Sequence, residues 1–294
     1  MTGPDRPRIE GRLLVTGATG HLGRHLVPML FHARLSPLLI GRSDANDLVV
    51  SDLADRAAVD AHAAALAPVT TLIHAAHPMR NAPVGAPGGD ELIDEPVRTT
   101  ANLLRGLGAL RRVVLVSSTA AERPRDLYGL SKGLDEELFR YAAAGRYELC
   151  ILRVSSIYGP NHTTERALAR FLRAALRGEP PRVRGLGGRG TDYVHVEDAA
   201  RAVMVAATSS VTGVLSVATG VASTPLRAAE LAMEAVGLAG DPIVESDATA
   251  GGEGAVPIDA TVRALGWRPR YDLASGLKDY AAWIRRTPDP DRSS

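Results

Sequence analysis

The chain has 294 residues, of which 34 are basic and 33 acidic, so that its formal net charge is +1 at neutral pH. Charges of both signs are interspersed, which excludes the basic face that nucleic-acid binding requires. No apolar run approaches the roughly eighteen residues of a membrane span, and the N-terminal segment lacks an apolar signal core. The single cysteine, Cys150, excludes an intrachain disulfide and the cysteine pairs of zinc motifs. We therefore expect a cytoplasmic protein with no metal and no nucleic-acid or membrane partner.

Short apolar runs alternate with amphipathic segments along the first half of the chain. We expect strands at residues 12–16, 37–40, 48–50, 71–75, 112–117 and 148–154. We expect helices at residues 21–32, 55–67, 92–110 and 128–144. This order predicts an α/β fold built on a doubly wound parallel sheet, the Rossmann arrangement. Residues 76–90, rich in Pro and Gly, would form a loop at the carboxyl end of the fourth strand, where ligands bind in such sheets.

The alternation loosens after Gly159-Pro160, and we expect a smaller substrate-binding lobe there. A helix is predicted at residues 165–177, whereas residues 196–207 and 214–218 would return to the sheet. The dinucleotide-binding domain is accordingly assigned to residues 1–155 and 191–220. The lobe takes residues 156–190 and 221–286, and residues 287–294 form a tail.

The first predicted strand leads directly into the glycine-rich segment GATGHLG at residues 17–23. In a strand-to-helix turn, the first glycine permits the tight turn, the second admits a pyrophosphate and the third allows close packing of helix on strand. The helix N-terminus then faces the anion. A purely structural glycine turn is the alternative. The cofactor contacts expected here are Gly17, Thr19, Gly20, His21 and Leu22.

Tyr128 and Lys132 lie one helical turn apart and share a helix face. Holding a phenol, with its ordinary pKa near 10, close to neutrality takes about three pKa units, or roughly 4 kcal/mol. An ammonium about 4 Å away supplies energy of that order at an effective dielectric constant near 20. The first turn of a helix favours the phenolate further. A Tyr-x-x-x-Lys spacing also arises by chance, but behind a dinucleotide fingerprint it predicts that Tyr128 is a general acid/base.

Several motifs occur in a fixed order between residues 12 and 283: TGATGHLG at 16–23, SDL at 51–53, HAA at 74–76, VSST at 116–119, YGLSK at 128–132, LRVSSIYGP at 152–160, DYVHVEDAARA at 192–202 and LGWRP at 265–269. Together they resemble the extended short-chain dehydrogenase/reductase family. That family includes nucleotide-sugar epimerases, dehydratases and ketoreductases.

The resemblance implies a role for each matching residue. Tyr128 would exchange a proton with a substrate hydroxyl or carbonyl, and Lys132 would lower its pKa while binding the nicotinamide ribose. Thr119, or Ser118 beside it, would hold the reacting oxygen. Asp52 matches the adenine contact of the family, with a helix N-cap as an equal alternative. The remaining cofactor contacts implied are Leu53, Ala75, Ala76 and Ser117, although the two alanines equally suit helix packing.

Cofactor preference depends on the end of the second predicted strand, where enzymes that prefer NAD usually carry an acidic residue. Here the sequence reads Gly41-Arg42-Ser43. Arg42 can bind a 2'-phosphate with two hydrogen bonds, and Ser43 can add a donor. Asp44 could instead reach a ribose hydroxyl. The sequence therefore favours NADP(H), with NAD(H) possible.

Departures from the family pattern concern the substrate. Ser156 stands where nucleotide-sugar enzymes usually have Asn, and Thr191 stands where they have an Arg that binds the diphosphate. A second such Arg is missing before Asp259. Arg182, Arg184 and Arg189 could replace these arginines. The absence of the two usual diphosphate-binding arginines weakens the interpretation of this chain as a nucleotide-sugar enzyme.

The interval from Thr119 to Tyr128 is only nine residues, a short form that resembles some bacterial deoxysugar ketoreductases. Residues 76–90 would then form much of a lid. The expected substrate contacts are His77, Arg80, Ser156 and Arg189. We expect an NAD(P)-dependent ketoreductase or epimerase acting on a small-molecule substrate, with a nucleotide-activated deoxysugar ahead of a non-nucleotide metabolite. A non-catalytic dinucleotide-binding protein is the alternative, and a homodimer through the helices at 92–110 and 128–144 is expected.

Overall fold

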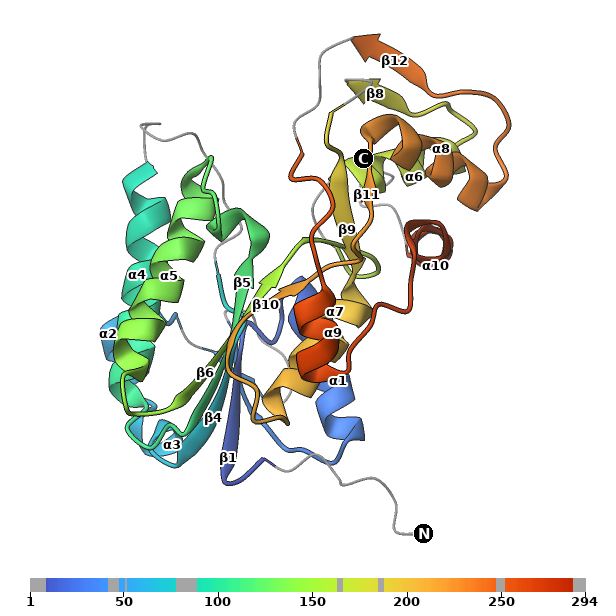
Figure 1. Ribbon diagram of the computed structural model, residues 1–294. Helices are drawn as coiled ribbons and strands as arrows, with labels where there is room; N and C mark the ends of the chain where they lie inside the picture. The colour runs from blue at the N-terminus through green and yellow to red at the C-terminus, as the bar shows by residue number, and fades with distance from the viewer. Residues whose placement is uncertain are drawn as a thin grey trace. The chain divides into compact units, whose positions relative to one another are not determined.

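The computed structural model describes residues 9–41, 48–50, 52–77, 89–162, 166–184, 188–246 and 252–287 (Figure 1). The chain divides into two compact units. Unit 1 comprises residues 1–154, 200–216 and 261–267, and unit 2 comprises residues 155–199, 217–260 and 268–294. Within the described residues, no helix has both the length and the apolar character that crossing a membrane requires.

Unit 1 contains a seven-stranded sheet with strand order β10-β6-β5-β4-β1-β2-β3. Every strand pair from β3 through β6 is parallel, as the Rossmann prediction requires. The elements of this unit are β1 (Arg12–Thr16), α1 (His21–His32), β2 (Leu38–Gly41), β3 (Leu48–Val50), α2 (Arg56–Asp60), α3 (Ala63–Leu66), β4 (Val69–His74), α4 (Gly89–Gly106), β5 (Arg112–Ser118), η1 (Thr119–Ala121), α5 (Leu127–Ala143), β6 (Glu148–Val154) and β10 (Gly213–Val217). Helices α7 (Val196–Ala207) and α9 (Asp259–Leu265) contribute their residues from 200 and 261 onward.

The strand order reverses at β1, because β2 and β3 lie on one side of it and β4, β5 and β6 on the other. In open α/β sheets, the carboxyl ends of the strands at such a point form the ligand-binding crevice. Gly17 follows β1 and Ala75 follows β4, so both segments meet at this point. The topology therefore brings the glycine-rich turn and the HAA motif together.

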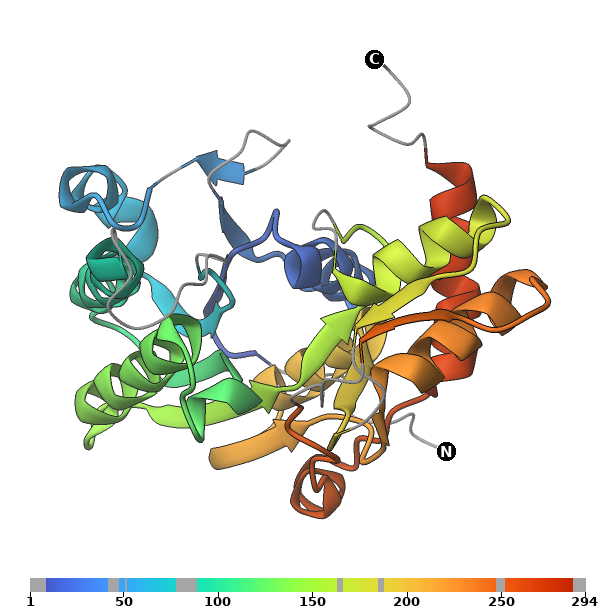
Figure 2. The ribbon, with the colours of Figure 1, turned by 90° about the horizontal axis from the view of Figure 1, so that it is seen from above.

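The core of unit 1 lies between the sheet and helices α4 and α5, which Figures 1 and 2 show side by side on one face, with α1 on the other. Leu103 of α4, Leu107 just after α4 and Phe139 of α5 are fully buried against Leu72 and Leu115 of the sheet. Burying each such side chain contributes roughly 1.5–3 kcal/mol. This packing holds α5, which carries Tyr128 and Lys132, against the sheet.

The described residues of unit 2 form two small sheets and three helices around a core of their own. The three-stranded sheet has the order β11-β9-β7, and β12 pairs with β8 in the second sheet. Its elements are β7 (Ser156–Tyr158), α6 (Ala167–Leu176), β8 (Arg182–Arg184), β9 (Thr191–His195), β11 (Ala222–Ser223), α8 (Pro225–Val236), β12 (Ile243–Ser246) and α10 (Leu273–Arg286). Tyr158, Phe171, Leu172, Leu277 and Tyr280 are buried in the core between them.

The structure differs from the sequence expectations in three places. The single helix expected at 55–67 is two short helices, because His62 N–H bonds to Val59 O at 3.0 Å and tightens the turn between α2 and α3. Residues 191–199 and 217–220 belong to unit 2, because β9 pairs with β7 and β11 and because the backbone N–H groups of Thr219 and Gly220 donate to Asp192 of β9. Residues 261–267 belong to unit 1 rather than to the lobe.

Candidate active site

The glycine-rich turn is built as its sequence suggests. Gly17 has a φ of 72°, and a Cβ there would lie 2.7 Å from the backbone nitrogen of Ala76. A Cβ on Gly23 would lie 2.2 Å from the carbonyl oxygen of Gly17. Both positions therefore require glycine, one for the left-handed turn and the other for packing of α1 against it.

Gly20, at the start of α1, has a different environment. A Cβ at this position would meet only the Gly17 carbonyl oxygen, at 3.2 Å, so the surrounding space is open. Among the described residues, no side chain caps α1, and its first turn carries no acidic residue. Backbone N–H groups and the positive end of the helix dipole suit an anion there. These features fit the pyrophosphate of a nicotinamide dinucleotide.

Thr16 connects the glycine-rich turn to the end of β4. Its hydroxyl accepts a hydrogen bond from Ala76 N–H at 3.3 Å and lies 2.8 Å from His74 Nδ1. The hydroxyl thus accepts from Ala76 and forms a second hydrogen bond with His74. Burial lowers the pKa of His74 to about 4, so that its ring is neutral at neutral pH. Ala75 and Ala76 are thereby held next to Gly17, where a cofactor can approach their backbone.

Asp52 forms a local turn rather than a helix cap. Its carboxylate accepts a hydrogen bond from Ala54 N–H at 3.0 Å, whereas the N-cap of α2 is Asp55. The N-cap alternative considered for Asp52 is therefore corrected. Leu53 is buried in the core, and Asn102 donates to its carbonyl oxygen at 3.1 Å. Asn102, which the sequence did not single out, fixes this turn to α4.

The first turn of α5 carries Tyr128, as expected. Asp126 caps the helix by accepting from Gly129 N–H at 2.8 Å. A Cβ on Gly129 would lie 2.7 Å from the carbonyl oxygen of Ala120, so glycine lets the helix pack against the η1 turn. Tyr128 is half-buried beside that turn. Asp126 and Gly129 thus fix the start of α5 and, with it, the position of Tyr128 in the first turn.

Lys132 is buried, and its Nζ donates to the carbonyl oxygen of Val116 at 3.0 Å. Burial lowers the pKa of Lys132 to about 8, although the carboxylates of Asp135 and Glu136 act in the opposite direction. An ammonium in this position is held in a low-dielectric environment, where its electrostatic effect is strong. The predicted charge partner of Tyr128 is therefore fixed in place.

The three hydroxyl residues at the end of β5 have different environments. Ser117 donates to Glu136 at 2.6 Å, and Ser118 accepts from Ala120 N–H at 3.2 Å. Both hydroxyls thus stabilise local structure. The expected contact of Ser117 with the cofactor would therefore have to come from its backbone. Thr119 begins the η1 turn. This favours Thr119 over Ser118 as the residue that holds a reacting oxygen.

His77 is buried within unit 1, against α5. Its side chain is only 4% exposed, and its two ring nitrogens lie 3.1 Å from Asp135 Oδ2 and 3.1 Å from Ser131 Oγ. The expectation of a substrate contact is corrected, because both nitrogens already bind groups within unit 1. Sequence reasoning missed Ser131 and Asp135, although their spacing of four residues places them on one face of α5.

The other predicted residues of unit 1 add less. Leu22 is buried, so only its backbone can reach a cofactor, and the Thr19 carbonyl accepts from Arg24 at 2.9 Å. Arg42, Ser43 and Arg80 lie outside the described residues. In the part of the chain that the structure describes, no group of three or more His, Cys, Asp or Glu residues could hold a metal ion.

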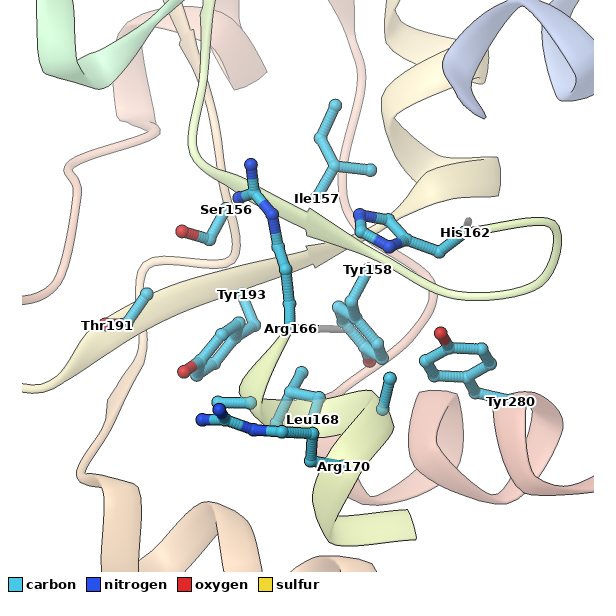
Figure 3. Close-up of a pocket in the computed structure, with 12 residues that line it drawn as sticks. Ser156, Ile157, Tyr158, His162, Arg166, Leu168, Arg170, Thr191, Tyr193 and Tyr280 are labelled. Atoms are coloured by element: carbon cyan, nitrogen blue, oxygen red, sulfur yellow. The ribbon is translucent and has the colours of Figure 1, made fainter. Parts of the chain in front are cut away.

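Unit 2 contains a pocket of about 300 Å³ between β7, β9 and α6 (Figure 3). Ser156 pairs in register with Tyr193 on the neighbouring strand, and both line the pocket with Thr191. Two arginines that the sequence did not single out, Arg166 and Arg170, lie one turn apart at the start of α6 and also line it. Figure 3 shows Arg166 extending past the strand that carries Ser156. Within the described residues, neither arginine forms an ion pair.

The arginines considered as replacements lie elsewhere. Arg182 and Arg184 bind Glu245 at 3.3 and 3.2 Å on the surface of the two-stranded sheet. Arg189 is exposed and packs against Gly254 instead of lining the pocket. The possible replacement of the missing arginines by these three residues, and with it the expected substrate contact of Arg189, is not supported at this pocket, where the start of α6 supplies the cationic side chains.

A model of the NAD dependent epimerase/dehydratase family matches residues 13–218. The low-salt glycan biosynthesis protein Agl12 of Haloferax volcanii is 31% identical over 158 residues, which is 53% of this chain and 51% of that protein. Ceramide reductase of Caulobacter vibrioides is 30% identical over 216 residues, covering 70% of this chain and 64% of the reductase. The solved structure of MoeE5 in complex with UDP-glucuronic acid and NAD has a TM-score of 0.80 at 27% identity, covering 94% of this chain and 99% of that one.

The fold and site define a Rossmann-type protein with a glycine-rich turn after β1 and a Tyr-Lys pair on α5. The chain belongs to the NAD dependent epimerase/dehydratase family. It spans about half the length of several curated relatives that it matches.

Proposed function

We propose that the protein is an NAD(P)-dependent ketoreductase or epimerase that transfers hydride between nicotinamide and a sugar-like ketone or alcohol. A nucleotide-activated deoxysugar is the first substrate candidate. The observation that carries the proposal is the placement of Tyr128 and Lys132 on one face of α5, with Lys132 buried and donating to Val116 O at 3.0 Å. A protein that only binds dinucleotides has no need of a fixed ammonium beside a phenol.

Each site residue of unit 1 has a separate role in the proposed reaction. The nicotinamide cofactor supplies the hydride chemistry when it is bound. Thr119 holds the reacting oxygen, and the Tyr128 hydroxyl gives a proton to that oxygen or takes one from it. Lys132 stabilises the phenolate that forms when Tyr128 gives up its proton.

The pocket of unit 2 supports the nucleotide-activated substrate. Arginine side chains bind phosphate oxygens with paired hydrogen bonds, and Arg166 and Arg170 lie at one pocket beside the aromatic ring of Tyr193. Thermal-shift measurements with UDP or TDP, alone and with NAD or NADP, test this. We expect a nucleoside diphosphate to stabilise the protein additively with the cofactor, and Arg166→Gln and Arg170→Gln to remove that increment. Arg182→Gln, which alters a surface ion pair with Glu245, is the matched control.

A ketone without a nucleotide is the second candidate. It is favoured by Thr191, which lines the pocket where the family pattern has an arginine, and by the named activity of the Caulobacter relative. If UDP and TDP give no thermal shift while the cofactor does, this candidate replaces the first.

We propose NADP(H) as the preferred cofactor, because Arg42 and Ser43 stand where enzymes that prefer NAD usually carry an acidic residue. The test compares kcat/KM with the two cofactors in wild type and Arg42→Ala, and the substitution should reduce efficiency with NADPH more than with NADH. Equal efficiency with both cofactors in the wild type would contradict the preference.

The proposal also includes a cytoplasmic homodimer formed through α4 and α5. The single cysteine supports the location, because it cannot form an intrachain disulfide. Light scattering measures the mass in solution, and a mass of one 31.0 kDa chain would reject the dimer.

A further inference from the structure

A buried polar cluster lies next to the Tyr128–Lys132 pair. His77 Nδ1 is 3.1 Å from Asp135 Oδ2, and the Thr100 hydroxyl donates to Asp135 Oδ1 at 2.9 Å. His77 Nε2 is 3.1 Å from Ser131 Oγ. The side chains of His77 and Asp135 are 4% and 2% exposed. Each oxygen of this buried carboxylate therefore has its own protein partner.

The cluster also contacts Tyr128 and flanks Lys132 along α5. Ser131 precedes Lys132 on α5, and Asp135 follows it by three residues. The ring of His77 meets the Tyr128 ring edge-on, with 5.5 Å between centroids and 83° between planes. Ser131 Oγ lies 2.9 Å from the Tyr128 carbonyl oxygen. A change in the cluster would therefore act on Tyr128 and on Lys132 together.

Hydrogen-bonding capacity determines where the protons lie. Burial and the nearby Lys132 lower the pKa of His77 to about 4, so its ring is neutral at neutral pH and carries one proton. An ionised Asp135 can only accept, which places that proton on Nδ1. Nε2 is then an acceptor that shares the single hydroxyl proton of Ser131 with the Tyr128 carbonyl oxygen, so that the imidazole presents its donor to the carboxylate.

The carboxylates of Asp135 and Glu136 both act electrostatically on Lys132, but only one of them lacks another cationic partner. Glu136 binds Arg153 at 3.0 and 2.9 Å and Arg140 at 2.8 Å, so its charge is already balanced. The two histidines that face Lys132, His74 and His77, are neutral. Asp135, whose two partners are an imidazole and a hydroxyl, is the carboxylate left to balance the buried ammonium.

We propose that Asp135 is the counter-ion of Lys132 and that His77 and Thr100 hold it ionised and in place. Both His77 and Asp135 are positioning residues, since they act on the reaction through Lys132 and Tyr128. Their effect on turnover rests on the proposed function, whereas the pairing of Asp135 with Lys132 does not.

The chain offers a direct probe, because it contains only two lysines, Lys132 and Lys278. Lysine labelled with 13C at Cε should give two NMR signals, which can be followed as a function of pH. Lys278 lies on α10 in unit 2 and is the internal reference. The variants are Asp135→Asn, His77→Leu, His77→Asn and Thr100→Val, with Asp94→Asn, which alters an exposed ion pair on α4, as the control.

We expect Lys132 in Asp135→Asn to lose its proton about one pH unit or more below the wild type, because an opposite charge is removed from a buried ammonium. His77→Leu should shift in the same direction by less. His77→Asn should restore most of the wild-type titration, since its amide can donate in place of Nδ1. Thr100→Val is nearly isosteric, so it keeps the test valid if His77→Leu does not fold.

An unchanged Lys132 titration in Asp135→Asn would overturn the pairing, and identical titrations in His77→Leu and the wild type would overturn the role of His77. Where turnover is measurable, the alkaline limb of the pH–rate profile should move with the NMR titration. If no substrate turns over, the NMR result still decides the pairing, so failure of the proposed function is distinguishable from failure of this inference.

Discussion

Gly20→Ala and Gly23→Ala should affect different properties of the protein, although the two residues belong to the same glycine-rich segment. We expect Gly23→Ala to lower thermal stability and Gly20→Ala to lower cofactor affinity. In Gly23→Ala the new Cβ would lie 2.2 Å from Gly17 O and 2.5 Å from Ala18 O, both of which belong to the backbone. Overpacking of this kind costs about 1–3 kcal/mol. Since each kcal/mol lowers Tm by roughly 2–4 °C, we expect Gly23→Ala to melt about 2–12 °C below the wild type.

In Gly20→Ala the Cβ meets only Gly17 O at 3.2 Å, which a shift of a few tenths of an ångström relieves. Stability should change little. The same methyl group would occupy the space in which the cofactor pyrophosphate is expected, so we expect affinity to fall about a hundredfold, or roughly 2.7 kcal/mol. Gly20→Ala should therefore lose binding while keeping its Tm.

The assay pairs thermal unfolding without ligand with a fluorescence titration of NADPH or NADH. Gly108→Ala, where the new Cβ would have no neighbour within 4 Å, is the control for both measurements. Wild-type affinity in Gly20→Ala would refute the placement of the pyrophosphate at this turn. A wild-type Tm in Gly23→Ala would refute the packing argument.

Three further predictions follow from the described contacts. Tyr128→Phe should abolish turnover while cofactor affinity, measured by titration, stays within about threefold, since the phenol acts on the substrate; an active Phe variant would exclude Tyr128 as the acid/base. Burial would raise the pKa of Glu136, but hydrogen bonds from Arg153 and Ser117 outweigh it and hold that pKa below its ordinary value. The ionised Glu136 carboxylate therefore stabilises the fold above about pH 4.5, and this stabilisation is lost as the pH falls. In denaturant titrations near pH 7, Glu136→Gln should have a free energy of unfolding about 3–5 kcal/mol below the wild type. The difference between the two proteins should be smaller at pH 4. Burial raises the pKa of the Cys150 thiol to about 11, so a thiol reagent at pH 8 should react only after unfolding, and rapid reaction of the native protein would contradict its burial.

Local pattern was sufficient for most elements of unit 1, although it did not predict the break between α2 and α3, because these elements depend largely on their own residues. Alternating apolar runs predicted β1 to β6, and the start of α5 was placed within one residue. The glycine spacing predicted the turn after β1, where Gly17 and Gly23 have no space for a side chain. The small sheets of unit 2 were missed. Strands of two to five residues, such as β7, β9 and β11, are too short to show periodicity, and their partners lie far away in sequence.

Contacts between distant segments account for the parts of the site that the sequence missed. His77 was expected to contact the substrate from a loop, yet Asp135, 58 positions later, binds its ring in the interior. Arg182 and Arg184 looked available until Glu245 was found 63 and 61 positions away. Arg166 and Arg170 resembled ordinary helix arginines until β7 and β9 formed a pocket beside them.

The sequence by itself determined the class of fold, the dinucleotide-binding turn and the Tyr128–Lys132 pair, because these depend on spacings within one turn or one helix. Only the tertiary structure decided which charges reach one another. Charge pairing depends on distances of a few ångströms between segments that the fold brings together, and burial strengthens the pairs so formed. The sequence thus indicated Lys132 as a cation at the site, and the fold supplied Asp135 as its partner and α6 as the source of arginines in the pocket of unit 2.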